Sequence, residues 1–426
     1  MKRRFIIAML GCLACSVIQA QTARTLTVTL SDDTHINMVG YLPTNPTGKA
    51  VVCCPGSSIQ HEGHDWAQYF NQLGIAYFVT ACSNRDDAEK AMLTVRDSAN
   101  VWRINPYAVG IMGFAEGGHL ATALSSLSEF AARPNFSILF YPIIPIKETP
   151  VHRHLTPPAI ILTANDDTTA SPVNNAVAYY TAMRRQGNDC ALYIYPTGGH
   201  GFGYRSSFTY HQQMLNDLTT WLQMHQGPKK DAVRVACIGN SITDGFGIDM
   251  ASQRGYPAQL QQLLGNDYHV KNFGVSGRTM LNKGDLPYQN ELAWRDALAF
   301  RPDIVIIKLG TNDSKPENWQ YNKGFKDDLQ QMVDALQANK NNPRIVLCTP
   351  IPAFKPTWNI NDSVIVNGIT PIIYKVAKKN KLQVIDLHTL YANDGDKMID
   401  DGIHPDAKGA RRMAEIIAEQ LKKETK

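Results

Sequence analysis

The sequence predicts two successive α/β domains, and three features of the chain support this fold class. The 426 residues exceed what one ordinary hydrophobic core contains, so two domains are expected. Short apolar runs alternate with helix-like stretches twice along the chain, which indicates mostly parallel sheets with helices on both faces. Between the two series lies a polar stretch, Gln226-Gly227-Pro228-Lys229-Lys230-Asp231, that is typical of a linker. We therefore expect domains over residues 21–225 and 232–426, joined by residues 226–231.

The first twenty residues have the pattern of a secretory signal peptide. A basic start is followed by an apolar stretch over residues 5–17, and Ala20 provides a small residue at the expected cleavage point. The apolar stretch is too short to span a bilayer, so no membrane insertion is expected beyond this segment. The prediction is a secreted, periplasmic protein, and lipid attachment through Cys12 or Cys15 is the alternative.

The charge of the chain narrows the classes of binding partner, and its cysteines narrow the kinds of cross-link or metal site. The formal charge is +4, and loss of the three basic residues of the signal segment brings it close to neutral. A chain with this balance and no basic run gives no support for nucleic acid or an anionic membrane as a partner. Most cysteines lie in or beside apolar runs, where a thiol acts as a small buried hydrophobe. Their spacing matches neither a disulfide framework nor a zinc site.

Eight strand-like runs are expected in the first domain, and helical stretches separate the later ones. The strand candidates are Leu26–Leu30, His35–Val39, Ala50–Cys54, Ala76–Thr80, Ala108–Met112, Ser137–Tyr141, Ala159–Thr163 and Ala191–Tyr195. The helical candidates are Asp86–Val101, Gly117–Leu127 and Pro172–Gln186. This alternation predicts a mostly parallel sheet.

The alternation restarts after the linker with five further strands. They are Val233–Ile238, Tyr268–Phe273, Asp303–Leu309, Arg344–Thr349 and Leu382–Leu387. Helices are expected at about Tyr256–Leu264, Phe325–Ala338, Val364–Lys379 and Ala407–Lys423. Five strands with intervening helices in under 200 residues predict a flavodoxin-like, three-layer α/β/α domain.

The second domain carries a nucleophile, a base and oxyanion donors at positions that suit one site. Ser241 follows the first strand, at the edge of the sheet where chemistry collects in open α/β folds. His404 can take the serine proton, and Asp401, three residues earlier, can orient the imidazole. Gly277 can offer a backbone N–H and Asn312 a side-chain amide to a tetrahedral oxyanion, with the N–H of Ser241 as a third donor. These five residues are the candidate catalytic set.

This set resembles the SGNH, or GDSL-type, hydrolase family. The four motif blocks of the family are represented by Ser241, Gly277, Asn312 and His404, and the resemblance covers the chain from about Asp231 to the C-terminus. One departure is Asn240, where the family often carries Asp. That position supports the turn before the serine rather than the chemistry.

Three stretches look more specifically like bacterial carbohydrate O-acetylesterases of this family, often labelled sialate or xylan acetylesterases. They are Asn272–Thr279, Gly284–Tyr288 and Gly310–Pro316. The resemblance implies an acetylated carbohydrate as substrate, an acetyl-enzyme intermediate and no cofactor. Four aromatic residues are either platforms for sugar rings or ordinary core and rim residues: Tyr288, Trp294, Trp319 and Trp358.

The first domain carries the pattern of a second hydrolase site that lacks its nucleophile. Residues 113–117 have the strand–turn–helix setting of a Gly-x-Ser-x-Gly nucleophile elbow, but Ala115 occupies the serine position. Asp167 and His200 follow in the order of the other two triad members. The segment 25–222 resembles small α/β-hydrolase esterases of the dienelactone-hydrolase and acyl-esterase kind. Because a methyl group cannot attack a carbonyl, we expect this domain to serve structure or sugar contact.

The leading interpretation is a secreted carbohydrate O-acetylesterase without metal or cofactor. His61, Glu62 and His64 lack a third ligand at a diagnostic spacing, so a polar loop is expected there. One alternative is a lipid or thioester acylhydrolase on the same triad, although the second domain has no long apolar insertion for an acyl chain. The other is a glycan-binding protein with two inactive sites, against which the complete set of catalytic residue types argues.

Overall fold

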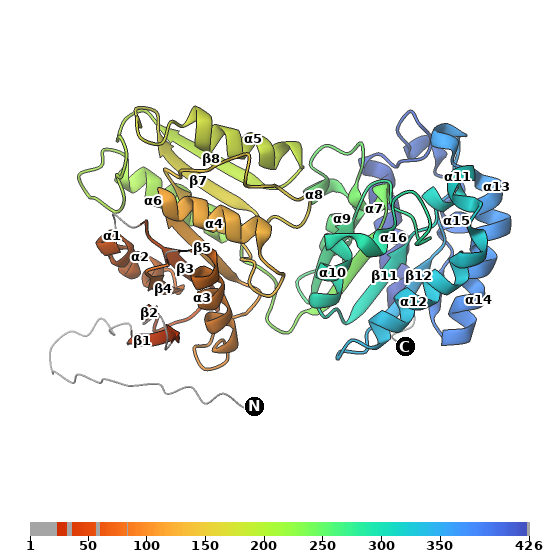
Figure 1. Cartoon of the computed structure of the whole chain (residues 1–426), viewed down its shortest axis with the longest axis horizontal. Coiled ribbons are helices and arrows are strands. Elements are labelled where there is room, and N and C mark those ends of the chain that lie inside the picture. Colours follow the sequence, from red (N-terminus) through yellow and green to blue (C-terminus); the bar gives the residue numbers. More distant parts are fainter. Residues whose placement is uncertain (1–23, 32–35, 57–59, 83, 424–426) are drawn as a thin grey trace. The chain divides into compact units, whose positions relative to one another are not determined.

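The computed structural model describes residues 24–31, 36–56, 60–82 and 84–423, so the predicted signal peptide lies outside the described residues. The chain divides into two compact units, Met1–Lys230 and Asp231–Lys426 (Figure 1). Within the described ranges, no helix has both the length and the apolar character needed to cross a membrane. Each unit has its own sheet and its own core.

The first unit is built on an eight-stranded sheet. Its order is β1-β2-β4-β3-β5-β6-β7-β8, with only the β1–β2 and β2–β4 pairs antiparallel. The strands are β1 (Arg24–Ser31), β2 (Ile36–Leu42), β3 (Ala50–Cys54), β4 (Ala76–Thr80), β5 (Val109–Phe114), β6 (Ser137–Phe140), β7 (Ala159–Ala164) and β8 (Cys190–Tyr195). Strands β3 to β7 are buried along their whole length, which explains why they are continuous apolar runs in the sequence.

Helices cover both faces of this sheet. They are α1 (Gln60–Asp65), α2 (Ala67–Gln72), α3 (Arg85–Asp97), α4 (Glu116–Leu127), the π-helix η1 (Val173–Val177), α5 (Ala178–Arg185) and α6 (His211–Met224). One core cluster joins the sheet to α3, α4 and α5 through residues such as Met92, Leu124 and Tyr179. The other joins it to α2 and α6 through Phe70 and Trp221. The mixed sheet between helices confirms the predicted α/β class.

The second unit is built on a five-stranded parallel sheet. Its strands are β9 (Val233–Gly239), β10 (Tyr268–Gly274), β11 (Ile304–Lys308), β12 (Arg344–Cys348) and β13 (Gln383–Ile385). The order β10-β9-β11-β12-β13 places the first strand of the unit second, as in flavodoxin-like sheets. All four strand pairs are parallel, so the loops that follow the strands gather at one edge.

The helices of the second unit include long ones on each face and short ones at the edge that carries the loops. They are α7 (Ser241–Asp244), α8 (Ala251–Arg254), α9 (Tyr256–Leu264), η2 (Tyr288–Asn290), α10 (Leu292–Ala299), η3 (Asn312–Ser314), α11 (Pro316–Trp319), η4 (Asn322–Gly324), α12 (Phe325–Gln337), η5 (Thr357–Asn359), α13 (Asp362–Val364), η6 (Ile365–Ile369), α14 (Thr370–Asn380), α15 (Leu387–Leu390), η7 (Gly395–Lys397) and α16 (Ala407–Lys423). Helices α9 and α16 share one core cluster with the sheet.

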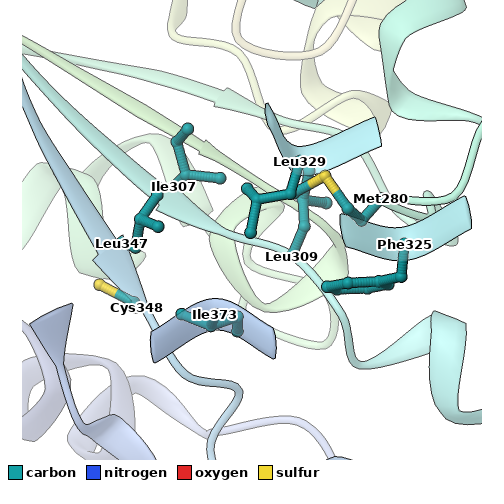
Figure 2. Close-up of a pocket in the computed structure, with 8 residues that line it drawn as sticks. All are labelled: Met280, Ile307, Leu309, Phe325, Leu329, Leu347, Cys348 and Ile373. Carbon is teal, nitrogen blue, oxygen red and sulfur yellow. The ribbon is translucent and has the colours of Figure 1, made fainter. Parts of the chain in front are cut away.

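The face of the sheet that packs on α12 and α14 contains a small apolar cavity of about 10 Å³. Figure 2 shows the side chains that line it, which come from the sheet, from both helices and from the loops after β10 and β11: Met280, Ile307, Leu309, Phe325, Leu329, Leu347, Cys348 and Ile373. Every lining residue is apolar, and the space holds about one water molecule. The cavity is a packing gap in the core and has no features of a substrate site.

Two helices differ from the sequence expectation, and the first is the one predicted over 172–186, where the π-helix η1 precedes α5. The second, predicted over 364–379, is interrupted by the π-turn η6, and α14 starts only at Thr370. Gly368 lies in this π-turn, and a Cβ at that position would come within 2.5 Å of the Trp319 ring. The bulge therefore accompanies a close approach between the helix backbone and a half-buried tryptophan.

Candidate active site

Ser241 is the first residue of α7 and lies directly beyond the carboxyl end of β9. The Oδ1 atom of Asn240 accepts a hydrogen bond from the N–H of Ile242 at 3.3 Å, which caps this short helix. The turn is tight, because a Cβ at Gly239 would lie 2.0 Å from the Thr243 hydroxyl. This turn places Ser241 at the edge of the sheet, where its side chain is buried and contacts His404.

Ser241, His404 and Asp401 form one hydrogen-bonded chain. The distance from His404 Nε2 to Ser241 Oγ is 2.7 Å, and that from His404 Nδ1 to Asp401 Oδ2 is 2.6 Å. The second oxygen of Asp401 accepts the backbone N–H groups of Ile403 and His404 at 2.8 and 3.0 Å. A carboxylate held in this way requires a proton on Nδ1, which leaves Nε2 free to accept the serine proton.

The electrostatic setting keeps His404 available as a base. Burial lowers the pKa of His404, while the neighbouring carboxylate of Asp401 opposes that shift in part. Burial alone would raise the pKa of Asp401, but hydrogen bonds from His404 and Ile403 hold it below its usual range. The Phe246 ring lies 4.6 Å from the imidazole, centroid to centroid, and covers part of it. At neutral pH the pair is therefore an ionised carboxylate beside a neutral imidazole.

The candidate oxyanion donors follow the two strands that flank β9. Gly277 comes after β10 and Asn312 after β11, and Ser241 lies between them in the strand order. Gly277 has φ +82°, a left-handed conformation that favours glycine. One N–H of the Asn312 amide donates to the Arg278 carbonyl at 3.0 Å, which fixes the plane of the amide and leaves its second N–H available. Among the described residues, the backbone N–H groups of Ser241 and Gly277 have no acceptor.

A buried carboxyl group, Asp313, holds the two donor loops together. Its oxygens accept the backbone N–H groups of Met280 and Leu281 at 3.0 and 2.8 Å. Burial raises the pKa of Asp313 to about 7, and these two hydrogen bonds oppose the shift. The residue follows Asn312 directly, so it ties the loop after Gly277 to the segment that carries the amide. Sequence reasoning gave Asp313 no role, although it lies in the same motif.

Sequence reasoning also missed Lys308, the last residue of β11. Its side chain is 1 % exposed, and Nζ donates to Asn240 Oδ1 at 3.2 Å. The available signal was a single lysine at the end of an otherwise apolar run. Lys308 therefore reaches the residue that precedes the candidate nucleophile.

The four candidate sugar platforms differ in exposure. Tyr288 and Trp294 are core residues, and the Tyr288 hydroxyl donates to the Phe273 carbonyl at 2.5 Å. Trp319 is half-buried, with its ring 5.9 Å from that of Phe325, whereas Trp358 is 61 % exposed. The neighbour of Trp358, Thr357, donates from its hydroxyl to the Asp401 carbonyl at 2.7 Å. Of the four, Trp358 is the one that combines exposure with a link to the Asp401–His404 loop.

The first unit retains the frame of a hydrolase site around Ala115. This residue has φ 47° and ψ −115° at the N-terminus of α4, a strained conformation for a residue with a side chain. A Cβ at Gly113 would lie 2.1 Å from the Gly117 carbonyl oxygen, so the elbow depends on glycine. His200 Nδ1 and Asp167 Oδ2 are 2.8 Å apart. The elbow and the Asp/His pair are therefore built, but a methyl group stands where the attacking hydroxyl would be.

No metal site emerges in the portion of the chain that the structure describes, since it contains no cluster of three His, Cys, Asp or Glu side chains suited to an ion. The Nδ1 atom of His64 lies 2.7 Å from the Tyr41 hydroxyl. The side chains of His61 and Glu62 lie outside the described part. The cysteines of the described ranges are free thiols, and Cys54 donates to Cys82 at a sulfur–sulfur distance of 3.3 Å.

Both units match known protein families. The GDSL-like Lipase/Acylhydrolase family model matches residues 237–412, and the Dienelactone hydrolase family model matches residues 75–226. The chain is 52% identical over 481 aligned positions to the acetylxylan esterase of Xylanibacter ruminicola, with 99% of this chain and 100% of that protein covered. The chain therefore belongs to the same family as this acetylxylan esterase. It is a carboxylic ester hydrolase, and the two resemblances inferred from the motifs are confirmed.

More distant relatives of this esterase cover parts of the chain. A multidomain esterase of Ruminococcus flavefaciens is 29% identical, with 29% of this chain and 16% of that protein covered. An arylesterase of Vibrio mimicus is 25% identical, with 45% of this chain and 88% of that protein covered. Among solved structures, the acetyl ester-xyloside bifunctional hydrolase from Caldicellulosiruptor lactoaceticus aligns with a TM-score of 0.43 at 20% identity, over 48% of this chain and 98% of that chain.

Proposed function

We propose that this enzyme removes acetyl groups from xylan or a closely related glycan, and that Ser241, His404 and Asp401 do the chemistry. The observation that carries the proposal is the unbroken hydrogen-bond chain from Asp401 through His404 to Ser241. The near full-length identity to an acetylxylan esterase supports an acetylated glycan as the substrate. The chemistry of the site requires no cofactor.

The first half-reaction transfers the acetyl group to the enzyme. Ser241 Oγ attacks the ester carbonyl while His404 Nε2 takes its proton, and Asp401 stabilises the imidazolium that forms. The negative charge on the carbonyl oxygen is stabilised by the free amide N–H of Asn312 and by the backbone N–H groups of Ser241 and Gly277. The imidazolium then protonates the sugar oxygen, which leaves as an alcohol.

The second half-reaction uses the same groups on water. His404 removes a proton from a water molecule, whose oxygen attacks the acetyl carbonyl on Ser241. The same three donors stabilise the second tetrahedral intermediate. Acetate leaves, and the proton returns from His404 to Ser241 Oγ.

The side chains beside the site favour a short acyl group. Phe246 covers His404, and Leu286 Cδ1 would lie 3.3 Å from a Cβ at Gly277, so apolar bulk borders both the base and an oxyanion donor. Each buried methylene is worth about 0.8 kcal/mol where a pocket can receive it, but here a longer acyl chain would meet these two side chains. We expect kcat/KM to fall from 4-nitrophenyl acetate to the butyrate and octanoate. A preference for octanoate would favour the lipid acylhydrolase alternative.

The direct test of the substrate class is acetate release from a panel of acetylated glycans. Xylan, xyloglucan, pectin and sialoglycans would be incubated with the enzyme and analysed by mass spectrometry, with chemically deacetylated glycans as controls. We expect acetylated xylan or its oligosaccharides to lose acetyl groups. Binding without release from any glycan or small ester would instead support the non-catalytic glycan-binding alternative.

Trp358 is proposed to stack on the sugar that carries the acetyl group. Trp358→Ala should raise KM for acetylated xylo-oligosaccharides about 3- to 10-fold, the scale of one exposed aromatic contact. KM for 4-nitrophenyl acetate should not change, because that substrate has no sugar. Tyr374→Ala, which removes another exposed aromatic residue, is the matched control. Equal effects of Trp358→Ala on both substrates would contradict this role.

The proposed oxyanion donor Asn312 gives a further expected result. Asn312→Ala should lower kcat about 10²- to 10³-fold, the usual scale for one such donor, with a smaller change in KM. The substitution also removes the hydrogen bond to the Arg278 carbonyl, so thermal unfolding must be measured beside activity. Asn322→Ala, at an exposed asparagine, is the control. An undiminished kcat would remove Asn312 from the mechanism.

The first unit is proposed to contribute structure or sugar contact without a second esterase centre, because Ala115 offers no nucleophile. Secretion is proposed on the pattern of residues 1–20. N-terminal sequencing of the protein recovered from the producing cell and from its medium would test the cleavage after Ala20.

A further inference from the structure

Lys308 is a buried lysine next to the proposed nucleophile that the mechanism above does not use. It ends β11 and pairs in register with Gly239 of β9, two residues before Ser241. Its side chain is 1 % exposed, and Nζ donates to Asn240 Oδ1 at 3.2 Å. A lysine amine almost never lies at such depth unless it is paired or functional.

The partner of this lysine is a neutral amide instead of a carboxylate. In the described part of the chain, no Asp or Glu oxygen forms a salt bridge with Lys308. The Asn240 side chain is fully buried, its Oδ1 accepts from both Lys308 Nζ and the Ile242 N–H, and its Nδ2 has no partner within the described residues. The positive charge of Lys308 is therefore not neutralised where it meets the turn before Ser241.

We propose that Lys308 is a positioning residue of the esterase site, which holds the Asn240 turn in place and extends activity toward lower pH through its positive charge. The inference rests on the proposed function of Ser241 and His404. It adds a residue that touches neither the substrate nor the reacting atoms. Its first action is mechanical, because the Nζ–Asn240 hydrogen bond fixes the side chain that caps α7.

Its second action is electrostatic and falls on His404, whose Nε2 lies 2.7 Å from Oγ of Ser241, the residue that follows the asparagine bound by Lys308. The charged groups that act on this imidazole are Asp401 beside it, Asp244 of α7 and Lys308 of β11. The two carboxylates raise the pKa of His404, whereas Lys308 lowers it. Burial lowers the pKa of Lys308 itself to about 7. Over the acidic range in which His404 gains its proton, Lys308 is therefore charged and favours the neutral, basic imidazole.

Three substitutions separate the two actions. Lys308→Met removes both the donor and the charge, Lys308→Gln keeps an amide donor without charge, and Asn240→Asp adds a carboxylate that neutralises the lysine. We expect kcat to fall about 10- to 100-fold in Lys308→Met, the scale of a slightly misplaced nucleophile, and to recover largely in Lys308→Gln. KM should stay close to that of the wild type in each, because none of these side chains contacts the substrate.

The decisive readout is the pH dependence of kcat/KM with 4-nitrophenyl acetate. In all three variants the acidic limb of this pH profile should move to higher pH by about half a unit or more, because a positive charge that lowers the pKa of His404 is lost or neutralised. Lys375→Met, at an exposed lysine of α14, should leave the limb in place. A structural role alone would lower thermal stability and kcat and would not move the limb.

Measuring Ser241→Ala in parallel distinguishes the proposed esterase site from the positioning role of Lys308. If it is inactive while Asn240→Asp and Lys308→Gln retain the wild-type limb, the role of Lys308 is wrong and the proposed site stands. If Ser241→Ala stays active, both claims fall. Should Lys308→Met not fold, as judged by circular dichroism, the limbs of the other two variants decide.

Discussion

Ser241→Ala is expected to lower kcat about 10⁴- to 10⁶-fold on every ester, because the alanine methyl cannot form the acyl-enzyme. The remaining rate would come from substrate binding and the oxyanion donors. The substitution removes one oxygen atom at a buried position, so the thermal unfolding midpoint should change little. Steady-state kinetics with 4-nitrophenyl acetate and acetylated xylo-oligosaccharides would measure the loss.

Two controls sharpen that result. Ser206→Ala, at an exposed serine of the first unit, should keep full activity. Ala115→Ser in the Ser241→Ala background should remain inactive. The resemblance to dienelactone hydrolases implies a glycine-rich oxyanion loop at residues 56–58, where this chain has Gly-Ser-Ser. Substantial turnover by Ser241→Ala alone would remove the nucleophile assignment.

Asp401→Asn should have the next largest effect, a fall in kcat of about 10³- to 10⁴-fold. The amide offers an N–H where the carboxylate accepts one, so the substitution favours the wrong tautomer of His404 and removes the charge that stabilises the imidazolium. The 2.6 Å contact between His404 Nδ1 and Asp401 Oδ2 is the one that is altered.

The neighbouring residue provides the control for that variant. Asp400 is exposed, and its backbone carbonyl accepts from Lys355, so Asp400→Asn should keep wild-type kcat. The Asp401→Asn protein should also bind substrate with a similar KM. A kcat within tenfold of the wild type would show that the imidazole does not depend on this carboxylate.

The sequence predicted the sheets better than the helices and loops. The strands match because buried parallel strands are short, continuous apolar runs bounded by polar residues, as in Ala50–Cys54. Helices α6 and α10 were not predicted. The π-turn at Ile365–Ile369 accompanies a close approach of Gly368 to Trp319, which lies in another segment and gives no local signal in the sequence. Strand β13 is also shorter than its apolar run, which continues into α15.

The site divides in the same way. Ser241, Asp401 and His404 stand out in the sequence because each has a residue type with a known chemical role in a short motif, and the structure places them within hydrogen-bond distance of one another. Lys308 lies outside these motifs, and Asp313 lies in one of them without a chemical role that the sequence alone indicates. Their significance comes from burial and from partners that only the folded sheet brings near. The catalytic roles of Ser241, Asp401 and His404 and the positioning role of Lys308 are predictions that the variants described above test.

All esterase activity of this enzyme is expected to pass through one covalent intermediate on Ser241. A fluorophosphonate probe, which forms a stable adduct with an activated serine, would be allowed to inactivate the enzyme, and the labelled peptide would be mapped by mass spectrometry. We expect one adduct per chain, on Ser241, formed in step with the loss of activity. Complete inactivation with the adduct on any other residue, or with Ser241 unmodified, would contradict it.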